Sequence, residues 1–273
     1  MSSTLAVGEA VQFRGPAGVL AVLLLEFALG SLAVIWLTPV WGVVKRGFFL
    51  LVGYGVLVTA LLARLAANGP LDKVGSEGAT ASRALWAFVA LSAGFTAALQ
   101  LKRLPLARVL GILAVPAGVA AVLAIAALRG DGDTGEIVEG ALAMLTGAAF
   151  LGATWDGMLL GHWYLVDRKL TPRPMKALAL AFTVSIGLAV VSAALARGGD
   201  PTAAESSLNP LLYVSGLTLY LALGLVAVNA LLAFFVHKLV NEGSIRAATG
   251  MLYLAVIMAF SAELAAKARF FTL

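Results

Sequence analysis

Long apolar runs, each ended by a short polar or glycine-rich stretch, repeat along the whole chain. Eight of these runs hold about 20 mostly apolar residues, the length that a helix needs to cross a bilayer. They cover residues 17–44, 47–65, 82–101, 106–128, 140–166, 177–196, 210–240 and 247–266. The pattern predicts an all-α polytopic membrane protein with eight transmembrane helices in a single integral membrane domain over residues 1–273.

The breaks between the runs carry residues typical of turns. They read NGPLDKVGSEG at 68–78, RGDGDTGE at 129–136, DRKLTPRP at 167–174 and ARGGDP at 196–201. A short tail, 1–16, precedes the first four helices, within 17–128, and the last four lie within 136–266. Pro39 and Pro116 fall inside apolar runs and are expected to kink their helices, which membrane helices tolerate.

The composition supports the membrane class and narrows the chemistry. Apolar residues make up 61% of the chain and charged residues only 12%, whereas a soluble domain has about 25% charged residues. The net charge of +5 is explained by basic loops and does not indicate nucleic-acid binding. Because the chain has no cysteine, it offers no ligands for an iron–sulfur cluster and no Cys-ligated metal.

Charge asymmetry between the loops predicts the orientation. The loops after the first, third, fifth and seventh helices hold eleven basic residues and two acids, and the opposite side holds eight basic residues and nine acids. Basic loops stay in the cytoplasm. We therefore expect a multi-pass protein of the cell (inner) membrane with both termini outside the cytoplasm.

The two sets of four helices suggest an internal duplication. A shift of 130 residues places Glu26 on Asp156 and Arg46 on Lys176, and it superposes the first two helices on the fifth and sixth. Only four identities follow between residues 26 and 65. The duplication therefore stays a hypothesis, of a parallel repeat.

Glu26 and Asp156 interrupt apolar runs, and they are the main candidates for catalysis. Glu26 lies in LLLEFALGS and shares a helix face with Gly30 and Ala33, so it is expected to face another helix. Asp156 lies in TWDGMLLGHWYLV. An ionisable group at membrane depth marks a functional site by default, and both residues are predicted proton carriers. The alternative is a protonated carboxyl that bonds a neighbouring helix.

The run around Asp156 also holds the candidate binding residues. Trp155 and His162 share one face and Asp156 and Trp163 a neighbouring face. Gly157 and Gly161 form a GxxxG pair that lets another helix approach. We expect His162 to donate a hydrogen bond to a quinone carbonyl, with Trp155, Trp163 and Tyr164 packed on the ring.

The only two histidines, His162 and His237, lie near the same predicted membrane boundary. Imidazoles at equal depth could hold one haem b iron from both faces. They could instead contact a quinone, or simply cap helix ends. Haem ligation by His162 and His237 would be the only metal binding expected.

The C-terminal stretch GMLYLAVIMAFSAELAAKARFF, with Glu263, Lys267, Arg269 and Phe270, resembles the last helix of the NrfD and DMSO-reductase membrane-anchor family. Eight helices in two sets of four with both termini outside are similar to that family too. The resemblance implies oxidation or reduction of a quinol within the bilayer, without haem, and electron transfer to an iron–sulfur partner. It also implies an acidic residue and a histidine near the quinone. From its position nearer the outer end of the last run, Glu263 can extend toward water, and a structural role is favoured for it over a functional one.

Together these observations favour a quinone-binding subunit of a respiratory electron-transfer complex that moves protons and electrons, with the lipid bilayer and other subunits as partners. A b-type haem cytochrome, a proton-coupled transporter and a non-catalytic structural subunit are the alternatives. Phosphate-binding glycine loops, HExxH and a recognisable Ser–His–Asp pattern are absent from the sequence, which disfavours a hydrolase.

Overall fold

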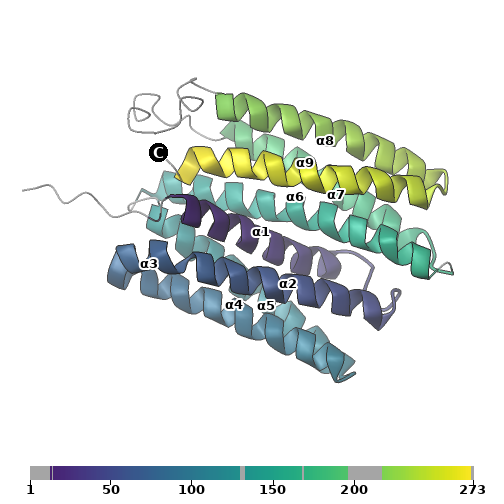
Figure 1. Ribbon diagram of the computed structural model, residues 1–273, viewed down its shortest axis with the longest axis horizontal. Helices are drawn as coiled ribbons and strands as arrows, with labels where there is room; N and C mark the ends of the chain where they lie inside the picture. Colours follow the sequence, from purple (N-terminus) through teal and green to yellow (C-terminus); the bar gives the residue numbers. More distant parts are fainter. Residues whose placement is uncertain (1–12, 14, 130–132, 168, 196–216, 272–273) are drawn as a thin grey trace, which may run out of the picture.

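The computed structural model describes residues 13, 15–129, 133–167, 169–195 and 217–271, and all the regular structure in these ranges is helical (Figure 1). The helices are α1 (Pro16–Leu37), α2 (Arg46–Ala66), α3 (Asn68–Val74), η1 (Gly75–Glu77), α4 (Gly78–Gln100), α5 (Leu104–Arg129), α6 (Thr134–Val166), α7 (Arg173–Leu195), α8 (Leu217–Asn241) and α9 (Ile245–Phe271). Eight of them are long and apolar enough to cross a membrane. This confirms the predicted all-α class and the number of long helices within the described residues.

Two boundaries differ from the predictions. The first helix ends at Leu37, so Pro39 follows it in a turn and does not kink it; Pro116 does lie inside α5. The expected break at 68–78 is mostly helical, as α3 and η1. Pro70 is compatible with α3 because it lies in the first turn, where the missing N–H leaves no hydrogen bond unmade.

The start of α6 also differs from the prediction. It begins at Thr134, where the Asp133 side chain accepts a hydrogen bond from the Gly135 N–H at 2.7 Å and caps the helix. Most of the predicted tail, the break at 196–201 and the start of the seventh run at 210–216 lie outside the described residues.

The long helices pack as two sets of four. In the first set α1 packs on α2, α2 on α4, α4 on α5, and α5 returns to α1; in the second set α6, α7, α8 and α9 repeat this cycle. The sets meet through α1 against α6, and α5 also contacts α6 as α9 contacts α1. Figure 1 shows the helix axes running along the length of the molecule, with α1 and α6 between the outer helices.

The central position of α1 follows from its sequence. Apart from Glu26 and Ser31 it is apolar or small on every side, and a helix that is apolar all round is buried. By contrast, α2, α5, α7 and α8 carry many large apolar side chains on the outer surface, among them Leu62, Leu113, Val191 and Leu231.

Small residues bring α1 and α6 into close contact. A Cβ atom added to Gly30 would lie 1.7 Å from the Ala148 carbonyl oxygen, and one added to Gly152 would lie 2.1 Å from the Gly30 carbonyl carbon. Since residues further along α1 contact residues further along α6, the two helices are parallel. We call the end where both begin the Pro16 end and the opposite end the Val166 end.

The partner of the predicted Gly157–Gly161 pair is α9. A Cβ on Gly161 would lie 2.3 Å from Thr249 Oγ1, and a Cβ on Gly157 would lie 3.4 Å from a Leu252 methyl group. This confirms that the pair lets another helix approach closely. Because α9 is antiparallel to α6, its last turns lie beside the first turns of α6 and beside the middle of α1.

Candidate functional site

Glu26 lies in a buried ionic cluster formed by α1, α6 and α9. Its side chain is fully buried, and its Oε1 lies 2.9 Å from Nζ of Lys267, a lysine with only 2% exposure. The same Nζ donates to Glu263 Oε2 at 3.0 Å and to the Ala143 carbonyl oxygen at 2.9 Å. Glu26 therefore faces other helices, as predicted, and its partner is a cation.

The sequence builds this cluster from three local features. Glu263 and Lys267 are four residues apart on α9, so they stand on the same helix face. Gly147 on α6 has no side chain, and a Cβ there would lie 2.7 Å from Glu263 Oε2 and 3.0 Å from Glu26 Oε2. Both carboxylates thus occupy the space that Gly147 leaves open.

Asp156 lies at a second buried polar point between α1 and α6. The Ser31 hydroxyl donates to Asp156 Oδ1 at 2.6 Å, and both side chains are fully buried. Asp156 Oδ2 has no hydrogen-bond partner among the described residues. Ser31 follows Glu26 by five residues, so the two residues are about 8 Å apart along the α1 axis.

The Val166 end carries a different ion pair. Lys45 Nζ lies 2.9 Å from Asp167 Oδ2, joining the segment between α1 and α2 to the end of α6. The hydrogen bond from Lys45 lowers the pKa of Asp167 below its ordinary value of 3.8. This pair is more exposed than the cluster, since the Lys45 side chain is 74% exposed.

The three predicted ring-packing residues contact protein groups on different sides of α6. Trp155 packs edge-on against Phe27 with ring centroids 4.9 Å apart. The Trp163 ring lies against Gly47, 6.4 Å from the Phe48 centroid. Tyr164 donates a hydrogen bond to the Thr171 carbonyl oxygen. Trp155 and Trp163 thus face α1 and α2, and Tyr164 is tied to the turn after α6.

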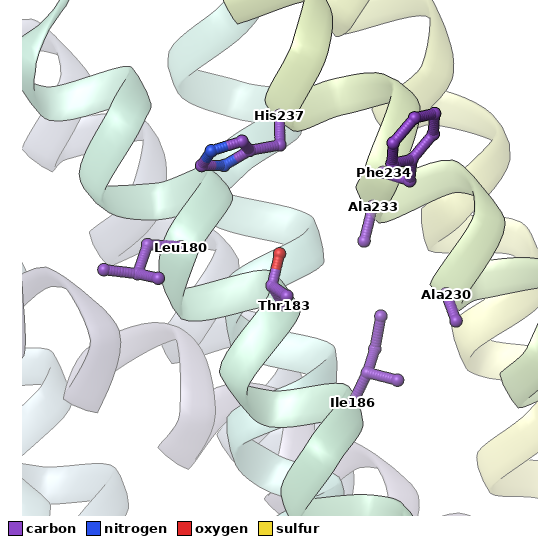
Figure 2. A pocket seen from close by; sticks show the side chains of 7 residues that line it. All are labelled: Leu180, Thr183, Ile186, Ala230, Ala233, Phe234 and His237. Carbon is purple, nitrogen blue, oxygen red and sulfur yellow. The ribbon is translucent and has the colours of Figure 1, made fainter.

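The two histidines lie on the outside of the helix bundle. His162 is exposed on α6. His237 is exposed on α8, where it lines a groove of about 310 Å³ against α7. Figure 2 shows the imidazole reaching from α8 toward α7, above Leu180, Thr183 and Ile186, with Phe234 at a similar height on α8. His162 does not line this groove.

The structure thus brings Glu26 together with residues that the predicted site did not include. Lys267 was not predicted to take part, and Glu263 is buried against it instead of extending to water. The sequence feature that could have predicted this cluster is the spacing of Glu263 and Lys267, which are four residues apart in an otherwise apolar run. Among the described residues, no group of three or more His, Asp or Glu side chains is arranged to hold a metal ion.

Comparisons of the chain with protein families, curated proteins and solved structures find no match. The buried carboxylates and the His237 groove are therefore the features of the molecule that bear on its function.

Proposed function

We propose that this protein is a multi-pass subunit of the cell (inner) membrane that binds a quinone and carries its protons through buried carboxylates, as part of an electron-transfer complex. The observation that carries the proposal is the placement of Glu26 and Asp156, both fully buried between helices of the two sets.

Insertion in a membrane is supported by the outer surface. Large apolar side chains on α2, α5, α7 and α8 stand exposed along these helices, and a water-soluble monomer rarely exposes such continuous apolar area. The excess of basic residues in the loops at the Val166 end supports a cytoplasmic location for that end, with both termini outside.

The carboxylates are suited to proton transfer because, among the described residues, Asp156 Oδ2 and both carboxyl oxygens of Glu26 accept no hydrogen bond, and Glu26 Oε1 is held by an ion pair with Lys267. A buried carboxyl exchanges a proton readily only when its charged form is not fully stabilised. Glu26 lies about 15 Å along α1 from Pro16, near the middle of a hydrocarbon core about 30 Å thick. Protons carried here would be shielded from bulk water.

The His237 groove is the best candidate quinone site on the surface facing lipid. Its walls are apolar, and an imidazole and the Thr183 hydroxyl are its polar groups. Such walls suit a lipid-soluble ring, and an imidazole N–H can donate to a quinone carbonyl. In this role His237 replaces His162, which lies outside the groove. Oxidation of a quinol releases two protons to the protein and two electrons, which must pass to an iron–sulfur or haem partner.

The last helix supports the same proposal. Residues 250–271 resemble the last helix of the NrfD and DMSO-reductase membrane-anchor family, and two of the residues that carry the resemblance, Glu263 and Lys267, are members of the buried cluster. The side chains of Arg269 and Phe270 lie outside the described part.

The test is quinol-dependent electron transfer in native membranes that contain either wild-type protein or Glu26→Gln. The amide keeps the size of the carboxyl and removes the proton site, so we expect turnover to fall at least tenfold with unchanged protein abundance. Glu242→Gln, at an exposed position, is the matched control and should retain full activity. Unchanged turnover in Glu26→Gln would remove Glu26 from proton transfer.

A proton-coupled transporter is a second candidate, favoured by the repeated packing of the two sets and the position of the carboxylates between them. Transporters built from repeats place their sites at the repeat interface near the midplane. Solute-driven proton uptake into proteoliposomes would support this candidate over the quinone proposal. A b-type cytochrome would instead show a haem absorbance spectrum.

A further inference from the structure

We infer that Glu26, Glu263 and Lys267 form one site that stores a single exchangeable proton between two carboxyl groups, beside a permanently charged ammonium group. The inference deepens the proposed function, on which only the movement of this proton during turnover depends. The presence of the proton in the resting protein depends on the geometry of the cluster alone.

The contacts of Lys267 favour its charged form. Its Nζ has three oxygen atoms at 2.9 to 3.0 Å, on Glu26, Glu263 and Ala143. Nζ donates hydrogen bonds to the Ala143 carbonyl and to Glu263, and it forms an ion pair with Glu26 Oε1, which accepts no hydrogen bond from the described residues. A neutral amine could donate both hydrogen bonds, but it would have no charge to attract the third oxygen atom.

The charges of the cluster do not balance when both carboxyls are ionised. One ammonium group then faces two carboxylates, which leaves one excess negative charge. The described charged side chains around it do not compensate this excess. Glu26 is the only titratable residue of α1, and the next titratable group along α6 is Glu139, one turn before Ala143 and itself acidic. The Arg269 side chain lies outside the described part.

Uptake of one proton removes the excess charge. A net charge in an apolar interior costs several kcal/mol, and a buried group usually neutralises instead. With one proton bound, the cluster contains one ammonium group, one carboxylate and one carboxylic acid, and its net charge is zero.

The surroundings of the two carboxyls assign the proton to Glu26. Its side chain is fully buried, and neither of its oxygen atoms accepts a hydrogen bond from the described residues. The Glu263 side chain is 8% exposed and accepts a hydrogen bond from Lys267, so its charge is better stabilised. Both carboxyls face the space that Gly147 leaves open, and both contact the same ammonium group, so either of them can hold the proton.

Lys267 acts here as a positioning residue. It holds the two carboxyls together from one nitrogen atom and fixes the number of protons that they need. This role differs from a purely structural ion pair, because it predicts how many carboxylic acids each variant contains.

The test is infrared spectroscopy of the purified full-length protein at neutral pH, with carbon-13 in the side-chain carboxyl of glutamate. Protonated glutamate has a carbonyl stretch separate from that of carboxylate, and the label distinguishes it from Asp156. Relative to one protonated glutamate in the wild type, we expect none in Glu26→Gln and none in Glu263→Gln. Each of these variants leaves one carboxylate paired with the ammonium group.

Lys267→Met provides the opposite change. Methionine is of similar length but has no charge, so both carboxyls should then be protonated and the band should double. Glu242→Gln is the control and should keep the wild-type band. No protonated glutamate in the wild type, or an unchanged band in both Glu26→Gln and Lys267→Met, would overturn the inference. A confirmed band with unimpaired quinol turnover in Glu26→Gln would instead contradict the proposed function alone.

Discussion

Individual residues in this chain differ most in how their charges are compensated. Glu26 and Lys267 are buried in contact with each other, and Glu263 pairs with the same ammonium group, so a change at any of the three alters the charge balance of a buried cluster. Among the described residues, the Ser31 hydroxyl is the hydrogen-bond partner of Asp156. Lys45 and Asp167 form a pair that water reaches. Substitutions in the buried Glu26–Lys267 pair are therefore expected to have large effects on the protein, and substitutions in the Lys45–Asp167 pair are expected to have small ones.

The Lys45–Asp167 pair gives a prediction with a defined sign. The pKa of Asp167 is lower in the folded protein than its ordinary value of 3.8. The pair therefore stabilises the fold above that value, and this contribution is lost as the pH falls through the lowered pKa. Lys45→Met should slightly reduce the thermal stability of the detergent-solubilised protein at neutral pH.

The same variant should show no reduction once Asp167 is protonated. Melting temperatures of wild type and Lys45→Met measured at neutral pH and well below pH 3.8 check this. A difference between the two proteins that persists at the lower pH would contradict the assigned cause.

Sequence reasoning located the buried carboxylates but not their partners. An acidic residue within an apolar run predicts burial against other helices, because exposing an ionisable group to the lipid is costly. Which residue pairs with it depends on how far antiparallel α9 is shifted along α6, and apolar periodicity does not fix that shift. Lys267 was therefore counted among the loop charges, and Glu263 was expected to reach water.

At the scale of helices, the contact between α1 and α6 decides the geometry of both polar points. Gly30, Ala148 and Gly152 bring the two backbones together, which places Ser31 against Asp156 and Glu26 beside Gly147. The turn at 38–45 and the helix at 68–74 were not predicted, in each case because of how a proline was interpreted. Pro39 sits in an apolar stretch that looks helical, and Pro70 is tolerated in a first turn.

Replacing Gly30 with alanine tests this contact. The added methyl group would lie 1.7 Å from the Ala148 carbonyl oxygen, so the helices must separate. Overpacking of this kind costs about 1–3 kcal/mol, and we expect a lower midpoint of thermal unfolding in detergent.

The matched control is Gly187→Ala in α7, where an added Cβ meets nothing within 4 Å. Alanine is favoured over glycine in a helix by about 1 kcal/mol, so this variant should be equally or more stable. Equal stability of Gly30→Ala and Gly187→Ala would show that α1 and α6 are not in close contact.

At the scale of the molecule, the two sets of four helices pack in the same cyclic order and meet through α1 and α6. This order is what a duplicated four-helix unit would produce, and we propose that origin. The number of long helices followed from the sequence because each span needs its own apolar run. The cyclic packing order could not be predicted from the sequence, since four identities in an Ala- and Leu-rich segment carry no information on packing.

The central claim is that Glu26 gains and loses a proton inside the bilayer during turnover. Infrared difference spectroscopy on the protein as isolated from its native membrane, before and after addition of a quinol, tests it most directly. The account predicts a change in the protonated-carboxyl band that shifts with carbon-13 glutamate and is absent from Glu26→Gln. A difference spectrum without any change in protonated glutamate would contradict it.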